Sequence, residues 1–337
     1  MGYLLNCRYN LSMKHQKLRV LAPFLATLTL ISVAAPSFGW GVVGHRYANG
    51  LAVDSLPDSL KNFYAPNRAW IVAHSSDPDQ WRNKDRSEAP HHFIDLDFWG
   101  MDAVKTFPTD YWTACGLYGK AAVDKNGTVP WRIAYLEAKL TKAFREKDAK
   151  GIIEISAFLG HYVADTHVPF HAATNYDGQL TGQKGIHARF ESVMVERQIK
   201  DTDLKPLPLV HIDAPAMTAI EWAKVSLNRS FEVLVSDKES TAKDAQYGDV
   251  YYTELGKKCR PIALNALQES GRDLASLWVS AWEAAGKPVL PAPSDVHSGE
   301  PLDKPTTDPD TPAKPETSVP VQTSAPSPKA ETPVKKP

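Results

Sequence analysis

The chain has 337 residues, of which 43% are hydrophobic and 23% charged, and its formal net charge is -1. This length and apolar content are sufficient for a large buried core. Three cysteines are too few for a disulfide-rich miniprotein, and the composition excludes a collagen-like chain and a coiled coil. The near-neutral charge also provides no basic surface for double-stranded nucleic acid.

The first 39 residues have the composition of a secretion signal. They contain four Lys/Arg and no acidic residue, and the basic residues precede an apolar run over 20–36. Small residues at Ser37 and Gly39 then suit the -3 and -1 positions of a cleavage site. We predict a signal peptide over 1–39, cleavage before Trp40, and a secreted or periplasmic protein; an uncleaved anchor is the alternative. The mature chain would carry 34 basic and 39 acidic residues, a net charge of -5.

Residues 40–289 have the patterns of an all-α domain. Apolar residues recur at three-to-four spacing over 131–144, which indicates an amphipathic helix. Residues 152–166 are more apolar and indicate a buried helix, and two further helices are expected over 221–235 and 255–285. Gly271 is a possible weak point in the last of these. Because alternating strand patterns are scarce, we predict a bundle of six to nine helices.

Residues 290–337 form a Pro/Thr/Lys-rich C-terminal segment. The part from 291 onwards holds 12 of the 26 prolines and no Trp, Tyr, Phe or Ile. A segment with so little apolar bulk cannot offset the entropy lost on ordering. We therefore predict a disordered tail whose removal leaves stability and activity unchanged. We also expect a monomer without a stable membrane anchor.

Histidines and carboxylates gather at helical spacing inside the expected core. His161 and Asp165 lie four residues apart, so both project from one helix face, and His187 and Glu191 repeat that spacing. His171 lies between the two pairs. Imidazole and carboxylate are ligands that Zn²⁺ accepts when thiolates are absent. A single histidine on an apolar face is usually an ordinary core residue, but this whole cluster indicates a metal site.

Cleavage after Gly39 would create one more candidate ligand. Trp40 would then carry a free α-amino group, and His45 follows five residues later. An α-amino group has a pKa near 8, so it loses its proton to a metal about as readily as a histidine does. Trp40 could therefore chelate through its amino nitrogen and carbonyl oxygen. Cys115 and Cys259, the cysteines that remain after cleavage, are candidates for a disulfide.

These motifs, in this order, resemble the superfamily of the zinc-dependent bacterial phospholipases C and the single-strand-specific zinc nucleases. The string His161-Tyr-Val-Ala-Asp165-Thr-His-Val-Pro-Phe-His171 is similar to the central helix motif of both branches. The resemblance extends from Trp40 to about Gly286. It implies an all-α fold, a mature N-terminal Trp and three zinc ions per chain.

Carried over position by position, the resemblance implies three sets of ligands. The first zinc would take Asp79, His92, His161 and Asp165. The second would take His171, His187 and Glu191. The third would take the amino and carbonyl groups of Trp40, with His45 and the shared Asp165. The Pro-Asp and His-Phe contexts favour Asp79 over Asp77 and His92 over His91.

The remaining acid and histidines are expected away from the metals. Asp77, His91 and His167 would lie behind the ligands or in solvent. His74, His211 and His297 match no motif and are expected on the surface. Three aromatic residues adjoin ligands and either line the cleft or belong to the core: Trp81, Phe93 and Phe190.

The resemblance also implies a reaction. Three Zn²⁺ ions carry +6 against -3 from Asp79, Asp165 and Glu191, so the cleft would attract an anionic phosphodiester. A zinc-bound hydroxide would attack phosphorus, and Asp79 would orient or deprotonate that water. Asp165 would hold two metals together. No Ser or Cys nucleophile is required.

The two branches of the superfamily differ at motifs that this chain shares unevenly. The short spacing from Trp40 to His45 is similar to the nucleases, whereas Glu191 in place of an aspartate is similar to the phospholipases. We expect a phospholipase C-like hydrolase that acts on phospholipid head groups. A single-strand-specific endonuclease or 3′-nucleotidase is the alternative, and a non-enzymatic zinc-binding protein is the remote one.

Overall fold

A computed structural model describes residues 40–100, 105–308 and 310 of the protein. The chain divides into two units, Met1–Ala35 and Pro36–Pro337, and all the described residues belong to the second. The expected signal peptide lies outside the described residues.

The fold is all-α, which confirms the expected class: the described residues form helices and no strand. The long helices are α1 (Gly41–Ser55), α8 (Val129–Glu146), α9 (Ala149–Thr166), α12 (Pro215–Thr241) and α13 (Asp249–Ala284). The short α-helices are α2 (Asp58–Tyr64), α3 (Arg68–Ala73), α4 (Asp77–Lys84), α6 (Tyr111–Tyr118), α7 (Lys120–Lys125), α10 (Ile186–Ala188) and α11 (Val195–Gln198). The 3₁₀ segments are η1 (Ala65–Asn67), η2 (Arg86–His92), η3 (Leu96–Trp99), η4 (Pro169–Ala172) and η6 (Asp201–Asp203), and the π-helix is η5 (Arg189–Met194). The described helical segments exceed the six to nine expected because the short ones span too few turns to show a period.

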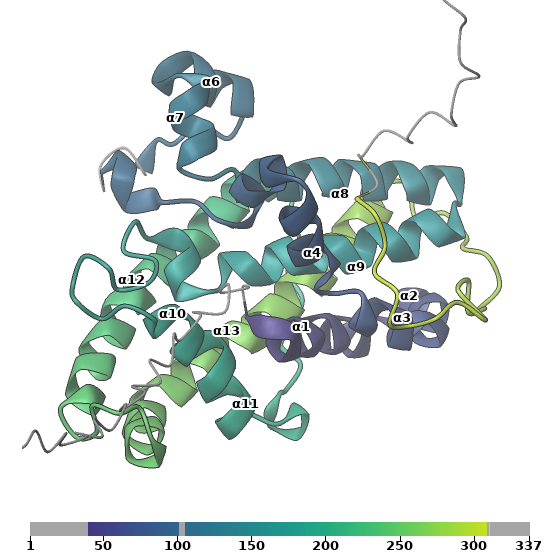
Figure 1. The fold of residues 1–337 in the computed structure, drawn as a ribbon. Helices are drawn as coiled ribbons and strands as arrows, with labels where there is room; N and C mark the ends of the chain where they lie inside the picture. The colour runs from purple at the N-terminus through teal and green to yellow at the C-terminus, as the bar shows by residue number, and fades with distance from the viewer. Residues whose placement is uncertain (1–39, 101–104, 309, 311–337) are drawn as a thin grey trace, which may run out of the picture. The chain divides into compact units, whose positions relative to one another are not determined.

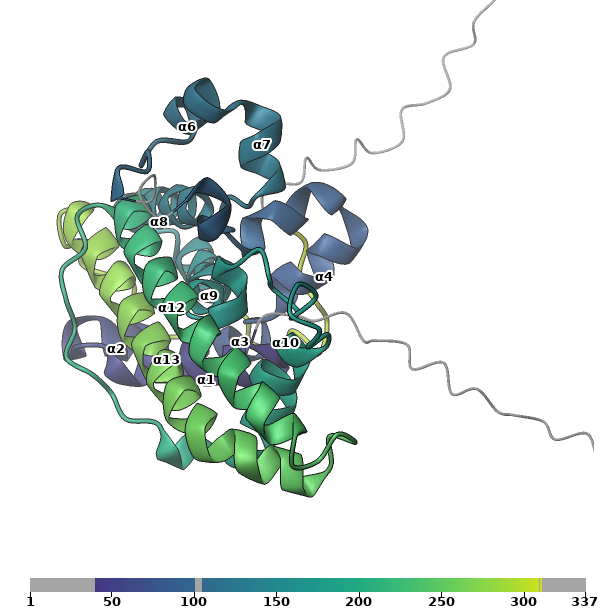
Figure 2. The same cartoon turned by 90° about the vertical axis from the view of Figure 1, so that its left-hand side faces the viewer.

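The long helices pack as neighbouring pairs. Helices α8 and α9 lie side by side, as do α12 and α13, and α1 packs along α13 (Figures 1 and 2). The turn between α8 and α9 has a local cause: Lys147 adopts a left-handed φ of 56° and Asp148 accepts a hydrogen bond from the amide of Gly151 at 3.0 Å. This N-cap starts α9, the helix that carries His161 and Asp165.

Gly271 is not a weak point, because α13 continues through it. A Cβ at this position would lie 2.8 Å from Cδ2 of Leu51 on α1. The glycine therefore allows α1 to approach α13 closely, and the sequence expectation was wrong about its role.

Two hydrophobic clusters form the core. In the first, Tyr64 stacks on Trp278 with ring centroids 4.8 Å apart. In the second, Trp40 packs on Phe190 at 5.9 Å, and neither side chain has any exposed surface. Trp81 is buried as well and meets Phe158 of α9 edge-on at 4.8 Å. Trp81 and Phe190 thus belong to the core.

Residues 291–308 and 310, which we call the C-terminal strap, lie against the domain. In Figure 1 this segment is yellow and passes α2 and α3 before it crosses α9 towards α8. The expectation of disorder from residue 290 onwards is wrong for the strap. Its anchors are polar: the side-chain amide of Asn67 donates to the carbonyl of Ser294 at 2.9 Å and accepts from the amide of Val296 at 2.9 Å. A composition low in apolar bulk does not reveal such anchors. The remainder of the predicted tail, residues 309 and 311–337, lies outside the described residues.

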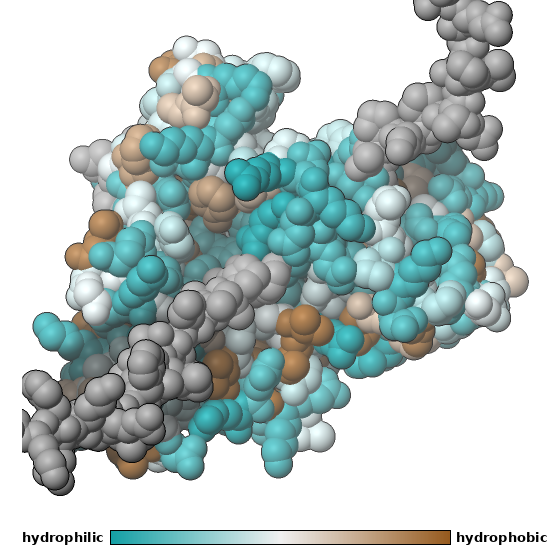
Figure 3. All heavy atoms as spheres, in the orientation of Figure 1, coloured by the Kyte–Doolittle hydropathy of each residue, from teal (hydrophilic) through white to brown (hydrophobic). Residues whose placement is uncertain are grey.

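The surface offers few further constraints on function. Hydrophilic side chains predominate on the face drawn in Figure 3, and hydrophobic ones occur there in small groups. Within the described part of the chain, no helix has both the length and the apolar character needed to cross a membrane.

Cys115 on α6 and Cys259 on α13 are free thiols, so the possible disulfide is absent among the described residues.

Candidate metal centre

The residues singled out as ligands come from separate segments and meet at one place. Helix α9 provides His161 and Asp165, whose side chains are fully buried. The other contributors are α1 with His45, α4 with Asp79, η2 with His92, η4 with His171, α10 with His187 and η5 with Glu191. All eight side chains are buried. Three groups of them have ligand atoms close enough to hold a metal ion: His45 with Asp79 and His161, His92 with His161 and Asp165, and His171 with His187 and Glu191.

The tightest group surrounds Asp165. Nδ1 of His92 and Nε2 of His161 lie 3.0 Å apart, and they lie 3.1 and 3.3 Å from Oδ2 of Asp165. Oδ1 of Asp79 lies 3.8 Å from both nitrogens. Four tetrahedral ligands at zinc bond lengths would be separated by about 3.3 Å. The four atoms therefore have the spacing of a compact metal site.

The other oxygen of Asp165 faces a different pair of imidazoles. Oδ1 lies 3.6 Å from Nε2 of His45 and 3.6 Å from Nδ1 of His171. The ring of His45 also stacks on that of His161, with centroids 4.1 Å apart. Asp165 thus presents one oxygen to each of two imidazole pairs, an arrangement suited to a carboxylate that links two cations.

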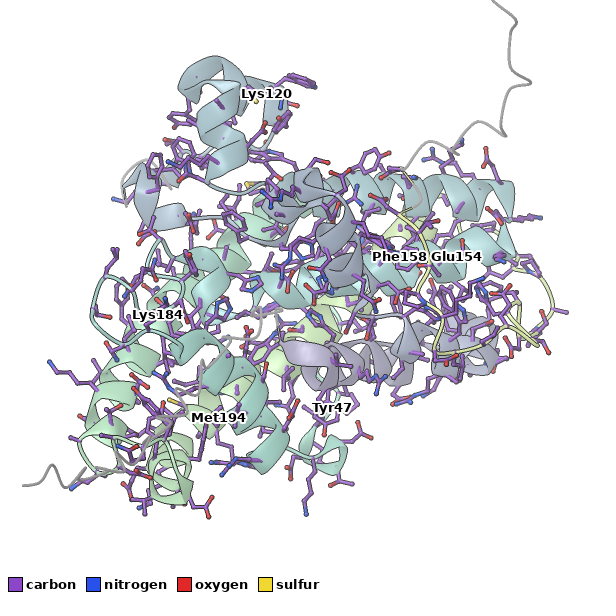
Figure 4. The ribbon with its side chains drawn as sticks, in the orientation of Figure 1. Tyr47, Lys120, Glu154, Phe158, Lys184 and Met194 are labelled. Atoms are coloured by element: carbon purple, nitrogen blue, oxygen red, sulfur yellow. The ribbon has the colours of Figure 1, made fainter. Side chains whose placement is uncertain are left out.

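Two members of another group, His187 and Glu191, lie in the segment between Lys184 and Met194, which are labelled in Figure 4, and the third is His171 on η4. Nε2 of His187 lies 2.8 Å from Oε2 of Glu191, and the ring of His187 meets that of His171 edge-on at 5.0 Å. The backbone changes from α-helix to π-helix between His187 and Glu191. Single π-turns are rare and frequently occur at functional sites.

Trp40 lies beside these groups. Its indole donates a hydrogen bond to the carbonyl of Ala164 at 2.9 Å, next to Asp165. Gly44 permits this position, since a Cβ there would lie only 2.5 Å from Cβ of Trp40. The backbone of Trp40 is thereby fixed one turn before His45. Its role as an amino-terminal ligand remains a prediction.

The rings of several candidate ligands are oriented by contacts with backbone carbonyls or with a further carboxylate. Nδ1 of His161 donates to the carbonyl of Ser75 at 3.0 Å, and Nδ1 of His171 donates to the carbonyl of His92 at 2.6 Å. Nε2 of His92 faces Oε1 of Glu88 at 3.5 Å. Such outer partners fix the ring orientation of metal-binding histidines. Sequence analysis missed Glu88; its position four residues before His92 was the available signal.

The protonation of the imidazoles differs across the centre. Burial lowers the pKa of His187 to about 4 and also lowers those of His45 and His171. Burial acts in the same direction on His92, but the hydrogen bonds that its ring donates to Asp165 and Glu88 outweigh it and raise its pKa to about 9. Burial opposes ionisation of Asp165, yet the neighbouring imidazoles hold its pKa well below the usual range.

The donor set fits a metal ion. Both ring nitrogens of His45, Oδ1 of Asp79 and Oδ1 of Asp165 are buried and have no hydrogen-bond partner among the described residues. Burying such atoms without a partner costs free energy, and more so for a carboxylate. A cation among them would remove that cost. These buried groups could therefore hold a metal ion.

Arg82 is a second residue that sequence analysis missed. It follows Asp79 by one helical turn on α4, and its Nη2 lies 3.7 Å from Oδ1 of Asp79. Its charge also lowers the pKa of His187, so the guanidinium acts on both groups of ligands. An arginine in this position can attract an anionic substrate to the centre. The signal in the sequence was the i, i+3 spacing from a candidate ligand.

The residues expected away from the metals divide into two classes. None of them belongs to a described ligand group. His211 is exposed, in agreement with expectation, and His91 is half-buried with Nδ1 2.8 Å from the Thr128 hydroxyl. The expectation of a surface position was wrong for His74 and His297, which are buried and both stack on Trp70. Asp77 and His167 are also buried, with His74 and Asp273 as their respective partners.

No protein-family profile matches the chain, and no curated protein is significantly similar to it. The argument for function therefore depends on the residues and geometry of the centre.

Proposed function

We propose that this protein is a zinc-dependent phosphodiester hydrolase. The observation that carries the proposal is the position of Asp165: this fully buried carboxylate lies within 3.1–3.6 Å of nitrogens from four histidines. The histidines are His45, His92, His161 and His171. Ligand sets rich in imidazole and carboxylate suit zinc, and a shared carboxylate suits a centre with more than one ion.

The residues that would hold three ions are those that the resemblance implies, with Asp165 shared between two of them. When bound, zinc lowers the pKa of a water ligand to about 7 and stabilises negative charge that develops on phosphoryl oxygens. Asp79 would orient or deprotonate the attacking water, as the resemblance implies, since its Oδ1 lies 3.8 Å from the ligand nitrogens of His92 and His161. Arg82, whose Nη2 lies 3.7 Å from that oxygen, would attract the phosphate.

For the substrate, we propose phospholipid head groups first. The loop that precedes His187 carries two exposed apolar side chains, Tyr176 and Leu180, which are 53% and 71% exposed. Apolar side chains next to a ligand segment can contact the glycerol and acyl portion of a lipid. The chain is proposed to act after secretion, in the form that begins at Trp40.

Single-stranded nucleic acid is the second candidate, favoured by the segment that follows His92. Phe93 is extended, so Phe93 and Asp95 lie on the same side of the chain, and both are half-buried. Burial, with a smaller contribution from Asp97, raises the pKa of Asp95 to about 7. An aromatic ring beside a carboxyl that can donate a hydrogen bond is suited to stacking on and recognising a nucleobase.

Hydrolysis assays test the proposal. The chain starting at Trp40 is incubated with phosphatidylcholine and, separately, with single-stranded DNA, before and after metal removal and zinc re-addition. We expect a phosphomonoester product from one of these substrates, loss of activity with the chelator, and recovery with zinc. Asp213→Asn, on the exposed surface, serves as a control. Turnover that survives complete metal removal, or no turnover of any phosphodiester, would contradict the proposal.

A further inference from the structure

We propose that the C-terminal strap is a positioning element of the metal centre, with Thr306 and Asp308 as its positioning residues. This inference rests on the proposed metal site. Thr306 would hold the segment that carries Asp79, and Asp308 would act through Arg132 on the segment that carries His92.

The first part of the strap is firmly anchored. Beyond the two hydrogen bonds of Asn67, the ring of His297 is buried and stacks on Trp70 at 3.8 Å with an interplanar angle of 9°. Nε2 of His297 also lies 4.0 Å from Glu154, which is labelled on α9 in Figure 4. Lys150 of the same helix binds Glu300 at 2.9 Å. These contacts fix the strap before it reaches α4.

Thr306 contacts α4 on both sides of Asp79. Its amide and its hydroxyl each donate to Oδ2 of Asp77 at 2.8 Å, and its carbonyl accepts from the indole of Trp81 at 2.8 Å. Asp77 also accepts from Nδ1 of His74 at 2.7 Å. Since Asp77, Asp79 and Trp81 occupy one helix of eight residues, Thr306 restrains the backbone that aims the Asp79 carboxylate.

Asp308 reaches the second ligand segment through a buried arginine. Nη2 of Arg132 lies 3.4 Å from Oδ1 of Asp308 and 3.8 Å from Oε2 of Glu88, and its Nη1 donates to Asp310 at 2.8 Å. Glu88 in turn accepts from the hydroxyl of Tyr162 and faces Nε2 of His92. The strap carboxylates therefore share the guanidinium with Glu88.

This sharing affects the ligand directly. Without Asp308 and Asp310, the charge of Arg132 would act on Glu88 alone, and Glu88 would hold the His92 ring less strongly. Outer partners of this kind change metal affinity by about 10–100-fold when they are removed. The contacts of Thr306 and Asp308 lead to α4 and, through Arg132 and Glu88, to His92, so we expect the largest effect on the metal held by Asp79 and His92.

Metal binding, measured without substrate, tests the proposal. The double variant Thr306→Val/Asp308→Asn is compared with the wild-type chain by zinc titration against a chromophoric chelator and by the visible absorption of the cobalt(II)-loaded protein. We expect affinity at one site to fall about tenfold and the cobalt spectrum to change, while the other sites keep their affinity. Thr306→Ser, which retains the hydroxyl, should behave as wild type in both measurements.

Two controls separate positioning from general stability. Asp303→Asn changes an exposed carboxylate of the strap that the proposal does not use and should leave zinc affinity and spectrum unchanged. Deletion of 315–337 should also leave zinc affinity and the cobalt spectrum unchanged. Deletion of 291–337 should change both as the double variant does, and should also lower the melting temperature. Unchanged affinity and spectrum in the double variant and in the 291–337 deletion would overturn the inference. If the wild-type chain itself bound no zinc, both the proposed function and the strap proposal would fail. If the wild-type chain bound zinc and hydrolysed substrate while the variants kept its zinc affinity and spectrum, only the strap proposal would fail.

Discussion

The two groups of ligands in the centre use the same side-chain types but are supported differently. The group around Asp165 is backed by Glu88, Arg132 and the strap, and hydrogen bonds to Asp165 and Glu88 outweigh burial and raise the pKa of His92 to about 9. The group of His187 and Glu191 is backed by Arg189, and burial lowers the pKa of His187 to about 4. Burial lowers the pKa of both imidazoles, and only at His92 do hydrogen bonds to carboxylates outweigh it.

The support of the second group is a compact buried network. Arg189 donates to Oδ1 of Asp237 at 2.9 Å, to the hydroxyl of Tyr251 at 3.0 Å and to the carbonyl of Gln183 at 3.2 Å. Because Arg189 lies in the π-helix between His187 and Glu191, this network fixes the backbone that carries both ligands. It belongs to α12 and α13, whereas the strap braces α4 and η2.

The largest expected effect comes from Asp165, whose two oxygens face different pairs of imidazoles. Asp165→Asn should lower zinc stoichiometry below three and reduce turnover by more than about 100-fold, because an amide cannot replace a carboxylate that links two cations. Metal analysis and a phosphodiesterase assay measure the two effects. Three tightly bound zinc ions with normal turnover in this variant would refute the assignment of Asp165.

The next effect concerns the amino terminus. A chain that begins Met-Trp40 should bind about two zinc ions and lose most activity, because an amide nitrogen is a poor zinc ligand. A chain that starts at Trp40 should bind three and be active. Both should fold, since the buried indole and its bond to Ala164 are retained. Equal activity of the two forms, measured side by side with zinc titration, would exclude Trp40 as a ligand.

Breaking the buried network should affect the second group of ligands alone. Asp237→Ala leaves the Arg189 charge without its carboxylate, and removing one partner of a buried pair costs about 3–5 kcal/mol. Denaturant unfolding should show this loss, and zinc binding should weaken at His187 and Glu191 while the Asp165 group retains its metal. The matched control is Glu239→Ala on α12, the helix that also carries Asp237. It removes an exposed ion pair with Lys258 of α13 and should lower the free energy of unfolding only slightly. Similar losses in both variants would show that the network has no special role.

The smallest effect concerns Asp95, at the edge of the first group. Burial raises its folded pKa to about 7 from 3.8, so its contribution to stability is complete below about pH 4 and is lost as the pH rises through 7. In metal-free protein, the free energy of unfolding of wild type should therefore fall relative to Asp95→Asn between pH 4 and 7. Asp213→Asn, on the exposed surface, should show no such relative change. A pH-independent difference between wild type and Asp95→Asn would mean that Asp95 ionises normally.

The sequence by itself determined the all-α class and the residues that gather at the candidate metal centre. The apolar period of α8 and α9, and the four-residue spacing of His161 with Asp165 and of His187 with Glu191, are properties of short segments. The choice of His45, Asp79 and His92 as ligands came instead from the resemblance of the ordered motifs to a known superfamily. The path of the strap, the burial of His297 and the link from Arg132 through Glu88 to His92 were decided by the tertiary structure alone. These features depend on hydrogen bonds and charges between segments distant in sequence, such as Thr306 with Asp77, and neither composition nor periodicity encodes which distant polar groups will meet.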